Sequence, residues 1–237
     1  MEFKIVSKRE FLKHNKKPNQ EKVWNSIAKP WKTYVVKTIP IVEEFLNKAN
    51  TLSKDNETAK IVDLGCGTGR NMIPNKNITY YGVDFSENQL KFAEKYVKKN
   101  KIKVRFFKSK ISKLDKKKFK NENFDYGLFI GSLHCLETGK ERFDSLKKFY
   151  RILKPNAQAL ISVWNSEDKR FARVNNHGDI YMSWSENRIP YMRYYYLFKK
   201  EELLSLIKSI GFKVLEFYKP REHDRFSKKN LIIRVGK

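Results

Sequence analysis

The stretch Ile61–Arg70, IVDLGCGTGR, decides how the rest of the chain is interpreted. A short apolar run that carries one acid, Asp63, is followed by three glycines at alternate positions, the first at Gly65. Such a turn after a strand lets a ligand approach main-chain N–H groups without obstruction by side chains. The spacing differs from the G-x-G-x-x-G dinucleotide fingerprint. Nineteen positions after Gly65, Asp84 ends the next predicted strand, where a carboxylate accepts hydrogen bonds from the ribose hydroxyls of an adenosine group.

Apolar runs and amphipathic runs alternate along the chain. Runs rich in Val, Ile, Tyr and Phe predict strands at residues 60–65, 79–84, 103–108, 124–131 and 158–164, and two more at 212–218 and 230–236. Helical patterns lie between them, over 86–100, 139–155 and 199–211. This alternation predicts an α/β, Rossmann-like fold, with a seven-stranded, mostly parallel sheet and helices on both faces. Its last two strands form an antiparallel end, and a ligand is expected at the carboxyl ends of the central strands.

The predicted helices carry start and stop signals. Ser86 with Gln89 three residues later is typical of a capping box, and Gly211 of a helix C-terminus. The helix over 139–155 is expected to end at Pro155 and to bury one face made by Phe143, Leu146, Tyr150 and Leu153.

Two regions extend this minimal layout of a single domain over residues 1–237. Residues 1–50 predict an N-terminal helical cap, with helices around 20–31 and 39–50. Residues 165–198 form a long insertion that is rich in Tyr, Trp and Arg. Long insertions of this kind are usually functional, so we expect it to form a substrate lid or wall.

Composition limits the classes of partner. The chain has 51 Lys and Arg against 26 Asp and Glu, a formal charge of +25, which favours polyanions and above all nucleic acid. The alternative is a general lysine bias on solvated helices. Cys66 and Cys135 predict neither a disulfide framework nor a zinc site, so no metal is expected. Without an apolar segment long enough for a membrane span, we expect a soluble cytoplasmic protein that contacts no membrane.

The motifs VDLGCGTG (62–69), GVDFS (82–86), FDYGLFIGSLHCL (124–136) and YRILKPNAQALISVW (150–164) resemble those of the class I S-adenosylmethionine-dependent methyltransferases. The resemblance implies S-adenosylmethionine as cofactor. It places the methionine part at Asp63 and the turn, the ribose at Asp84, and the adenine near Phe85 and Ile111. The cofactor-binding residues implied are Asp63, Gly65, Cys66, Gly67, Gly69, Asp84, Phe85, Ile111, Ile130 and Gly131. Lys110 stands where family members often have an acid, and Pro155-Asn156-Ala157 replaces a Pro-Gly-Gly turn.

A closer resemblance concerns the acceptor. The segments 23–46, SLHCLE (132–137) and RYYYLFKKEEL (193–203) resemble the tRNA wobble-uridine carboxymethyl methyltransferases, closest to their archaeal-like branch. That family esterifies 5-carboxymethyluridine in the anticodon. The resemblance implies tRNA as the partner and a small zinc-binding activator protein as a second partner, paired to a sheet edge for which residues 103–108 are the candidate. Val35 stands where the family has an arginine, and Ile39 where it has a tryptophan.

We predict Arg193, His134 and Tyr194 as catalytic residues. Arg193 is expected to grip the acceptor or a nearby phosphate, because a guanidinium binds either one in a bidentate manner. His134 is expected beside the cofactor. The predicted substrate-binding residues are Lys37, Trp164, Asn165 and Tyr196. For each of these residues an ordinary structural role is the alternative: packing for the aromatic rings and solvation for Lys37. Trp24, Trp31 and Tyr34 are interpreted as packing residues of the front helix.

No general base stands out in the sequence, which agrees with a carboxylate acceptor because a carboxylate is already a nucleophile. Two other interpretations stay open. One is methylation of another RNA nucleoside or of a small carboxylic acid. The other is a non-catalytic RNA-binding or scaffold protein.

Overall fold

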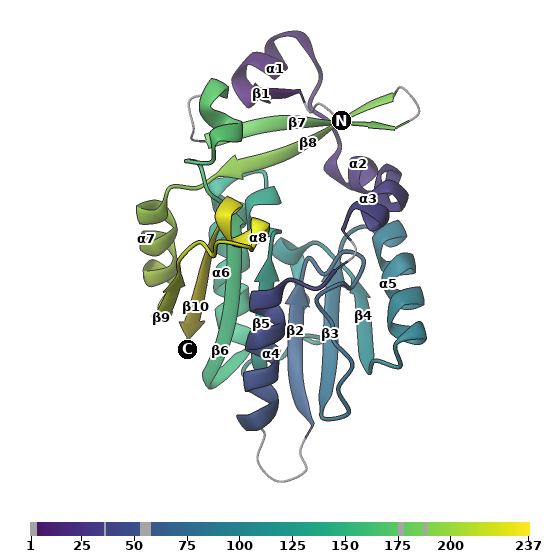
Figure 1. Ribbon diagram of the computed structural model, residues 1–237, viewed down its shortest axis with the longest axis vertical. Helices are drawn as coiled ribbons and strands as arrows, with labels where there is room; N and C mark the ends of the chain where they lie inside the picture. The colour runs from purple at the N-terminus through teal and green to yellow at the C-terminus, as the bar shows by residue number, and fades with distance from the viewer. Residues whose placement is uncertain (1–3, 36, 53–57, 175–177, 187–188) are drawn as a thin grey trace.

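The computed structural model describes residues 4–35, 37–52, 58–174, 178–186 and 189–237. Its main sheet has the strand order β4-β3-β2-β5-β6-β10-β9 (Figure 1). Strand β10 runs antiparallel to β6 and β9, whereas β2 to β6 pair in parallel. The expected seven-stranded, mostly parallel sheet is therefore confirmed. The strands are β2 (Ala59–Leu64), β3 (Ile78–Asp84), β4 (Val104–Lys108), β5 (Phe124–Ile130), β6 (Leu153–Trp164), β9 (Lys213–Tyr218) and β10 (Asn230–Gly236).

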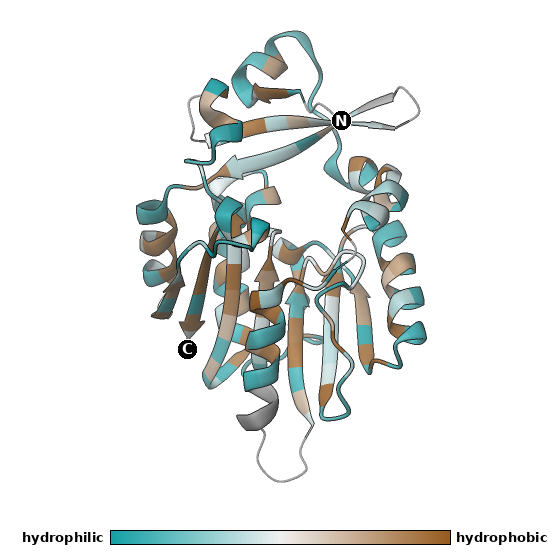
Figure 2. Cartoon of the chain, viewed as in Figure 1, coloured by the Kyte–Doolittle hydropathy of each residue, from teal (hydrophilic) through white to brown (hydrophobic). Residues whose placement is uncertain are grey.

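Helices cover both faces of the main sheet. One face packs against α4 (Pro40–Leu52) and α5 (Glu87–Lys99), and the other against α6 (Gly139–Ile152) and α7 (Lys200–Ile210). Each face has its own core, so strand residues alternate between the two cores. Figure 2 shows the resulting pattern, with apolar strands inside and polar outer faces on the helices. A short helix, α8 (Arg225–Lys229), precedes β10.

Helix α6 differs from its prediction in both its buried face and its end. Phe143 is exposed at 38%, and the neighbouring Arg142 is buried instead. The Arg142 guanidinium takes the inner position because it donates to the Leu136 carbonyl at 2.8 Å and to the Tyr194 hydroxyl at 3.2 Å. A hydrogen-bonded arginine can occupy a buried site that hydropathy alone assigns to a neighbouring phenylalanine.

Strand β6 begins earlier than predicted and runs through Pro155. The strand register shifts opposite Phe124–Tyr126, so Pro155 lies at an irregularity where no ladder N–H is required. Asn156 follows with a φ of 65°, and its N–H donates to the Lys237 carbonyl at 3.1 Å. Asparagine tolerates this left-handed conformation, which explains how it replaces glycine in the turn.

The front helix predicted over 20–31 is two helices, α2 (Gln20–Ser26) and α3 (Ala28–Tyr34), separated at Ile27. Pro30 explains the break: it lacks an N–H, and its ring would clash with the Ser26 carbonyl in a continuous helix. In the first turn of α3 the missing N–H has no consequence. The second front helix, predicted over 39–50, corresponds to α4.

A second, smaller sheet lies over the carboxyl ends of the central strands (Figure 1). This cap sheet is formed by β1 (Ile5–Ser7), β7 (Gly178–Glu186) and β8 (Ile189–Leu197), in the antiparallel order β1-β7-β8. Helix α1 (Lys8–His14) follows β1, and the short helix η3 (Lys169–Val174) precedes β7. The insertion 165–198 thus joins the N-terminal strand in one layer. Its role as a lid stays a prediction, as does the division of the domain.

The side chain of Gln20 connects α2 to the cap sheet. Its amide donates to the Met192 carbonyl at 3.2 Å and accepts from the Tyr194 N–H at 2.9 Å. These two bonds satisfy backbone groups on the outer edge of β8, in the place of a neighbouring strand. Among the described residues, no helix is long and apolar enough to cross a membrane.

Candidate functional site

The turn that follows β2, residues 65–69, is called the glycine turn here. A Cβ on Gly65 would lie 2.4 Å from the Ser132 Cβ, so only glycine fits against the loop that follows β5. Gly67 has a φ of 53°, and a Cβ there would meet only the Gln89 side-chain oxygen, at 3.9 Å. Gly65 is thus required by packing, whereas the backbone at Gly67 is left open toward a cavity.

Asp84 holds this turn in place from the end of β3. Its carboxylate accepts from the Gly67 N–H at 2.9 Å and from the Ser86 N–H at 2.8 Å. Burial raises the pKa of Asp84 to about 6, although these N–H donors favour the ionised form. The acid predicted from sequence is therefore next to the glycine turn.

A cavity of about 440 Å³ lies between the main sheet and the cap region. This volume is within the usual range for small-molecule sites. The main-sheet side of its wall contains residues 65–68 of the glycine turn, Asp84, Phe85, Lys110, Ile111, Ile130 and Gly131. The other side contains residues 17–21, Trp24, Trp31, Val35 and Cys135–Glu137. Most of the predicted cofactor residues thus line a single cavity; Asp63 and Gly69 lie outside its lining.

Three buried acceptor atoms have no donor from the described residues: Asn71 Oδ1 and Gln89 Oε1, whose residues line the cavity, and Asp63 Oδ2, at the end of β2 just before the glycine turn. Buried acceptors are normally satisfied, so this group fits a ligand that brings hydrogen-bond donors or positive charge. Burial raises the pKa of Asp63 to about 7, with a further increase from Asp84, while Arg70 opposes it. Burial lowers the pKa of Arg70 to about 10. Arg70 also lines the cavity and provides a cation near Asp63.

These donors and acceptors fit the zwitterionic end of an amino acid and the hydroxyls of a ribose. An ammonium group matches Asp63, a carboxylate matches Arg70, and hydroxyl donors match the acceptors near Asp84. The residues present therefore fit S-adenosylmethionine, whose amino-acid and ribose parts carry these groups.

Sequence reasoning missed Arg70, Asn71 and Gln89. Arg70 and Asn71 directly follow the glycine turn, and this position in the sequence could have indicated that they lie at the site. Gln89 was interpreted only as a capping residue, and half of that capping box is present: the Gln89 N–H donates to Ser86 Oγ at 3.2 Å. In a full capping box the Gln89 side chain would accept from the Ser86 N–H, but that N–H donates to Asp84 instead. The Gln89 side chain therefore stays near the glycine turn.

His134 does not line the cavity and is only 1% exposed. Its ring stacks on Trp164 with centroids 5.1 Å apart, and Nδ1 accepts from the Trp164 N–H at 3.3 Å. Burial lowers the pKa of His134 to about 3, and the charge of Arg170 lowers it further. The imidazole is therefore neutral near pH 7, with its proton on Nε2.

Arg193 lies behind the cavity wall and is 2% exposed. Its guanidinium lies 5.0 Å from the ring centroid of Trp184, 5.4 Å from that of Tyr195 and 5.8 Å from that of Trp31. Burial raises the pKa of the Cys135 thiol to about 12, and the charge of Arg193 acts against this increase. Cys135 lines the cavity, so the positive charge of Arg193 acts at that wall and offsets part of the effect of burial.

The other predicted acceptor residues lie outside the cavity lining. The Tyr194 hydroxyl is bonded to Asp179 and Arg142, and burial raises its pKa. The Tyr196 hydroxyl donates to the Glu202 carboxylate at 2.5 Å. The Arg142 guanidinium lies over the Tyr196 ring, 3.8 Å from its centroid. These tyrosines connect the cap sheet to α6 and α7. The ring centroids of Trp164 and Tyr195 are 3.9 Å apart. The backbone of Asn165 forms an isolated β-bridge with Phe198, and the Lys37 side chain is exposed.

Comparison with known proteins identifies the family. Residues 55–211 match the family described as "Methyltransferase domain". The chain belongs to this family. Its fold class and S-adenosylmethionine as its cofactor are thereby confirmed. Two solved structures that share the fold are both methyltransferases. The 1,6-didemethyltoxoflavin-N1-methyltransferase of Burkholderia thailandensis with bound S-adenosylhomocysteine has a TM-score of 0.65 and 18% identity, over 94% of this chain and 92% of that chain. The CcbJ methyltransferase of Streptomyces caelestis has a TM-score of 0.69 and 15% identity, over 92% of this chain and 98% of that chain.

Three curated relatives carry more specific names. A tRNA (carboxymethyluridine(34)-5-O)-methyltransferase of Schizosaccharomyces pombe is 27% identical over 82% of this chain and 88% of its own length. The protein of the same name from Saccharomyces cerevisiae is 28% identical over 69% of this chain and 55% of its own length. A probable tRNA methyltransferase 9B of Homo sapiens is 26% identical over 71% of this chain, a match that spans 34% of the human protein.

Proposed function

We propose that this methyltransferase acts on tRNA and esterifies the carboxylate of 5-carboxymethyluridine at the wobble position of the anticodon. The names of the Schizosaccharomyces pombe and Saccharomyces cerevisiae relatives support this acceptor. The formal charge of +25 supports a polyanionic substrate.

The observation that carries the proposal is the position of the Arg193 guanidinium behind the cavity wall, 5.8 Å from the ring centroid of Trp31, which lines the cavity. Its positive charge attracts an anion to that wall. The guanidinium does not line the cavity, whereas Trp31, whose ring centroid lies 5.8 Å from it, does, so Arg193 attracts a carboxylate without a direct hydrogen bond. A carboxylate held in this way keeps its lone pairs and stays nucleophilic.

The state of His134 and Tyr194 agrees with an acceptor that needs no base. The pKa of His134 is about 3 and its Nδ1 already accepts a hydrogen bond, so this imidazole is poorly placed to remove a proton. Burial raises the pKa of Tyr194, so its hydroxyl stays neutral. We assign His134, Tyr194 and Arg193 to positioning roles: they hold the aromatic rings behind the cavity in place, and Arg193 adds a positive charge there.

We assign the cofactor to the wall formed by the glycine turn. Asp84 holds the ribose, Asp63 and Arg70 hold the amino-acid end, and Phe85 with Ile111 flanks the adenine. S-Adenosylmethionine supplies, when bound, a methyl group on a positively charged sulfur. The acceptor carboxylate forms a bond from its oxygen to that methyl carbon as the carbon–sulfur bond breaks, and the electron pair stays on sulfur. A neutral ester and a neutral thioether result, and no proton is released.

Catalysis in this scheme depends on proximity and orientation, which supply about 7–11 kcal/mol in well-aligned reactions. The chain contributes the cavity that holds both reactants, the field of Arg193 and the aromatic rings that exclude water. Substrate binding is assigned to Trp164, Asn165 and Tyr196 only indirectly, through the cap sheet that they stabilise, whereas Lys37 is exposed and available to the substrate itself.

The proposal also includes a zinc-binding activator protein at the edge strand β4. This strand ends the main sheet, and its outer backbone groups are open to a further strand. Phe106 and Phe107 are half-buried and pack into the two opposite cores, as expected for neighbours on a strand.

The test is methyl transfer from labelled S-adenosylmethionine to tRNA that carries carboxymethyluridine, with and without the activator, followed by mild alkali. Label that enters the tRNA and leaves as methanol supports the ester. Label that resists alkali contradicts a carboxylate acceptor and points to a base or ribose. No incorporation in either condition, with cofactor binding shown by calorimetry, contradicts the tRNA substrate, and free carboxylic acids are then tested.

A further inference from the structure

Tyr34, at the end of α3, is an aromatic residue that faces solvent. It is 56% exposed, the largest value among the exposed large hydrophobic residues of the described chain. Its ring touches Trp184 edge-on with centroids 5.6 Å apart, while more than half of the residue stays exposed. An exposed ring fixed by a buried neighbour provides a rigid flat surface.

Tyr34 is the outer end of a row of rings that reaches the cavity. Its centroid lies 6.0 Å from that of Trp31, which in turn lies 5.1 Å from Trp24. Trp24 continues to Tyr195 at 6.4 Å. Since Trp31 and Trp24 line the cavity, this aromatic row leads from solvent to the site of methyl transfer. A single exposed tyrosine needs no explanation, but a continuous row that ends in the active cavity is a feature of the site.

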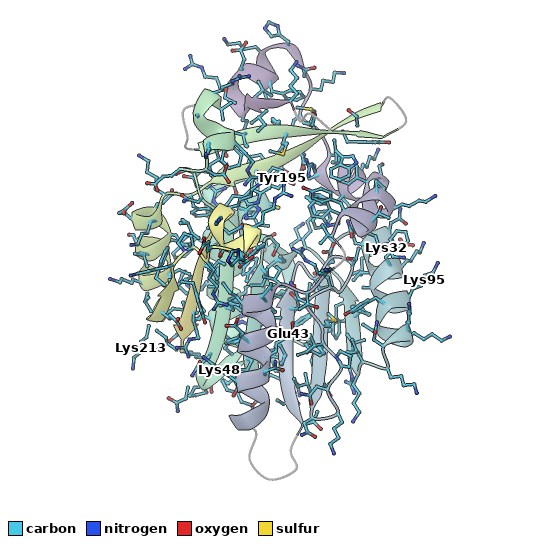
Figure 3. All side chains as sticks on the ribbon, viewed as in Figure 1. Lys32, Glu43, Lys48, Lys95, Tyr195 and Lys213 are labelled. Atoms are coloured by element: carbon cyan, nitrogen blue, oxygen red, sulfur yellow. The ribbon has the colours of Figure 1, made fainter. Side chains whose placement is uncertain are left out.

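Three exposed lysines lie in α3 or just after it. Lys29, Lys32 and Lys37 are exposed, and none of them forms an ion pair with any residue in the described ranges. Lys32 lies over the Phe92 ring at 5.2 Å from its centroid. Figure 3 shows Lys32 and Lys95 on the same side of the molecule, on neighbouring α3 and α5. Lysines without an ion pair, in or just after the helix that carries an exposed aromatic ring, complement a phosphate backbone that carries unstacked bases as it crosses that helix.

We infer that the outer face of α3 binds a single-stranded segment of the RNA substrate. Tyr34 stacks on an unpaired base beside the acceptor nucleotide, and Lys29, Lys32 and Lys37 contact its phosphates. A base inside a duplex has both faces covered by its neighbours, so stacking on Tyr34 selects a loop. This inference rests on the proposed function, because it assumes that the acceptor in the cavity is part of an RNA.

The first test measures binding by fluorescence anisotropy with two unmodified RNAs, a hairpin with a seven-nucleotide loop and a blunt duplex with the same stem. We expect Tyr34→Ala to weaken hairpin binding about tenfold and to leave duplex binding unchanged, and Tyr34→Phe to bind as the wild type does. Phe143→Ala, on exposed α6, is the matched control and is expected to change neither. Equal loss on both RNAs, or no loss, overturns the stacking role.

The second test replaces Lys29, Lys32 and Lys37 together by glutamine. We expect the slope of log K against log salt for the hairpin to become shallower by about 2, because each lost phosphate contact on a single strand contributes about 0.7. The control replaces Lys199, Lys208 and Lys213, three exposed lysines around α7 and β9, and is expected to keep the wild-type slope. Equal slopes for the two triple variants overturn the assignment of this face.

Two outcomes separate this inference from the proposed function. If the wild type methylates tRNA but the α3 variants bind the hairpin as tightly as it does, only the α3 surface is wrong. If the wild type binds S-adenosylmethionine by calorimetry but binds neither RNA, the tRNA substrate itself is contradicted, and the inference with it. All variants are expected to bind the cofactor with wild-type affinity, since none of the replaced residues lines the cavity.

Discussion

The Asp84 carboxylate accepts a hydrogen bond from the Gly67 N–H at 2.9 Å, so the acid at the end of β3 shapes the turn at the end of β2. A single side chain therefore both positions the glycine turn and faces the cavity.

We expect Asp84→Asn to weaken binding of S-adenosylmethionine about 10- to 100-fold. The amide removes the charge and one acceptor, and hydrogen bonds to charged groups contribute about 1.5–3 kcal/mol. Titration calorimetry measures the change. Glu87→Gln is the control, because Glu87 is an exposed acid paired with Lys91 at 2.8 Å and Lys108 at 3.0 Å. An affinity that changes equally in the two variants would contradict the role of Asp84.

The stability of the ligand-free protein is expected to depend on pH through Asp63. Its pKa of about 7 in the folded protein lies above its ordinary value of 3.8. Between these values the folded state keeps a proton that the unfolded chain has released, so this group's contribution to the free energy of unfolding is complete below pH 3.8 and is lost as pH rises to about 7.

Urea unfolding at pH 4.5, 6 and 7.5 tests this dependence. The free energy of unfolding should fall more steeply with pH in the wild type than in Asp63→Asn. Asp144→Asn should keep the wild-type dependence, because Asp144 forms an exposed pair with Lys140 at 2.9 Å and its pKa is lowered. Parallel pH curves for the wild type and Asp63→Asn would show that this carboxyl does not titrate as described.

Arg193→Met is expected to reduce kcat/KM for the carboxylate-bearing tRNA about tenfold, because it removes the charge that acts at Cys135. The loss should lie mainly in KM for the tRNA, while the affinity for S-adenosylmethionine stays unchanged. Arg193→Lys should restore part of the activity, since it keeps the charge but not the planar contacts with Trp184 and Tyr195.

A purely structural role for Arg193 would give a different result. Arg193→Lys and Arg193→Met would then lose activity in proportion to their loss of thermal stability, and the affinity for the cofactor would fall with it. Melting temperatures measured beside the kinetics separate the two cases.

Arg142→Ala is expected to lower the free energy of unfolding by about 3 kcal/mol. The change removes a buried charge that donates to Leu136 and Tyr194 and stacks on Tyr196, and hydrogen bonds to charged groups contribute about 1.5–3 kcal/mol each. Its neighbour Phe143 is exposed, so Phe143→Ala should change stability by less than about 0.5 kcal/mol. Chemical unfolding of the two variants decides which side chain supports α6, and a larger loss from Phe143→Ala would contradict the structure.

The parts of the molecule that could be predicted depend on short sequence motifs. Glycine conformations, the acid at Asp84 and the apolar strands are local properties, so the main sheet and most of the cofactor wall were accessible from sequence. The errors at Phe143 and Pro155 arose where a distant partner decides: Arg142 is buried because Leu136 and Tyr194 accept its hydrogen bonds, and Pro155 fits because Asn156 pairs with the C-terminal Lys237.

The acceptor side was less accessible for the same reason. His134 and Arg193 follow motifs that indicate a catalytic rim, but their burial is set by Trp164, Tyr195 and the front helices, which are far apart in the chain. Tyr34 was interpreted as a packing residue; its ring contacts Trp31 and Trp184, yet the residue is 56% exposed, which depends on the distant β7 and not on the local sequence.

The pairing of β1 with β7 has a consequence for the order of folding. Ile5 lies opposite Met182, so the N-terminal strand has no partner until most of the chain has been synthesised. Closing a loop of this length is slow compared with forming the neighbouring βα units of the main sheet. Strands β2 to β6 of the main sheet can therefore pair during translation, whereas the cap sheet that roofs the cavity forms only after the β7–β8 hairpin has left the ribosome. Strands β9 and β10 then complete the main sheet, so a nascent chain carries the glycine turn well before the cavity has its roof.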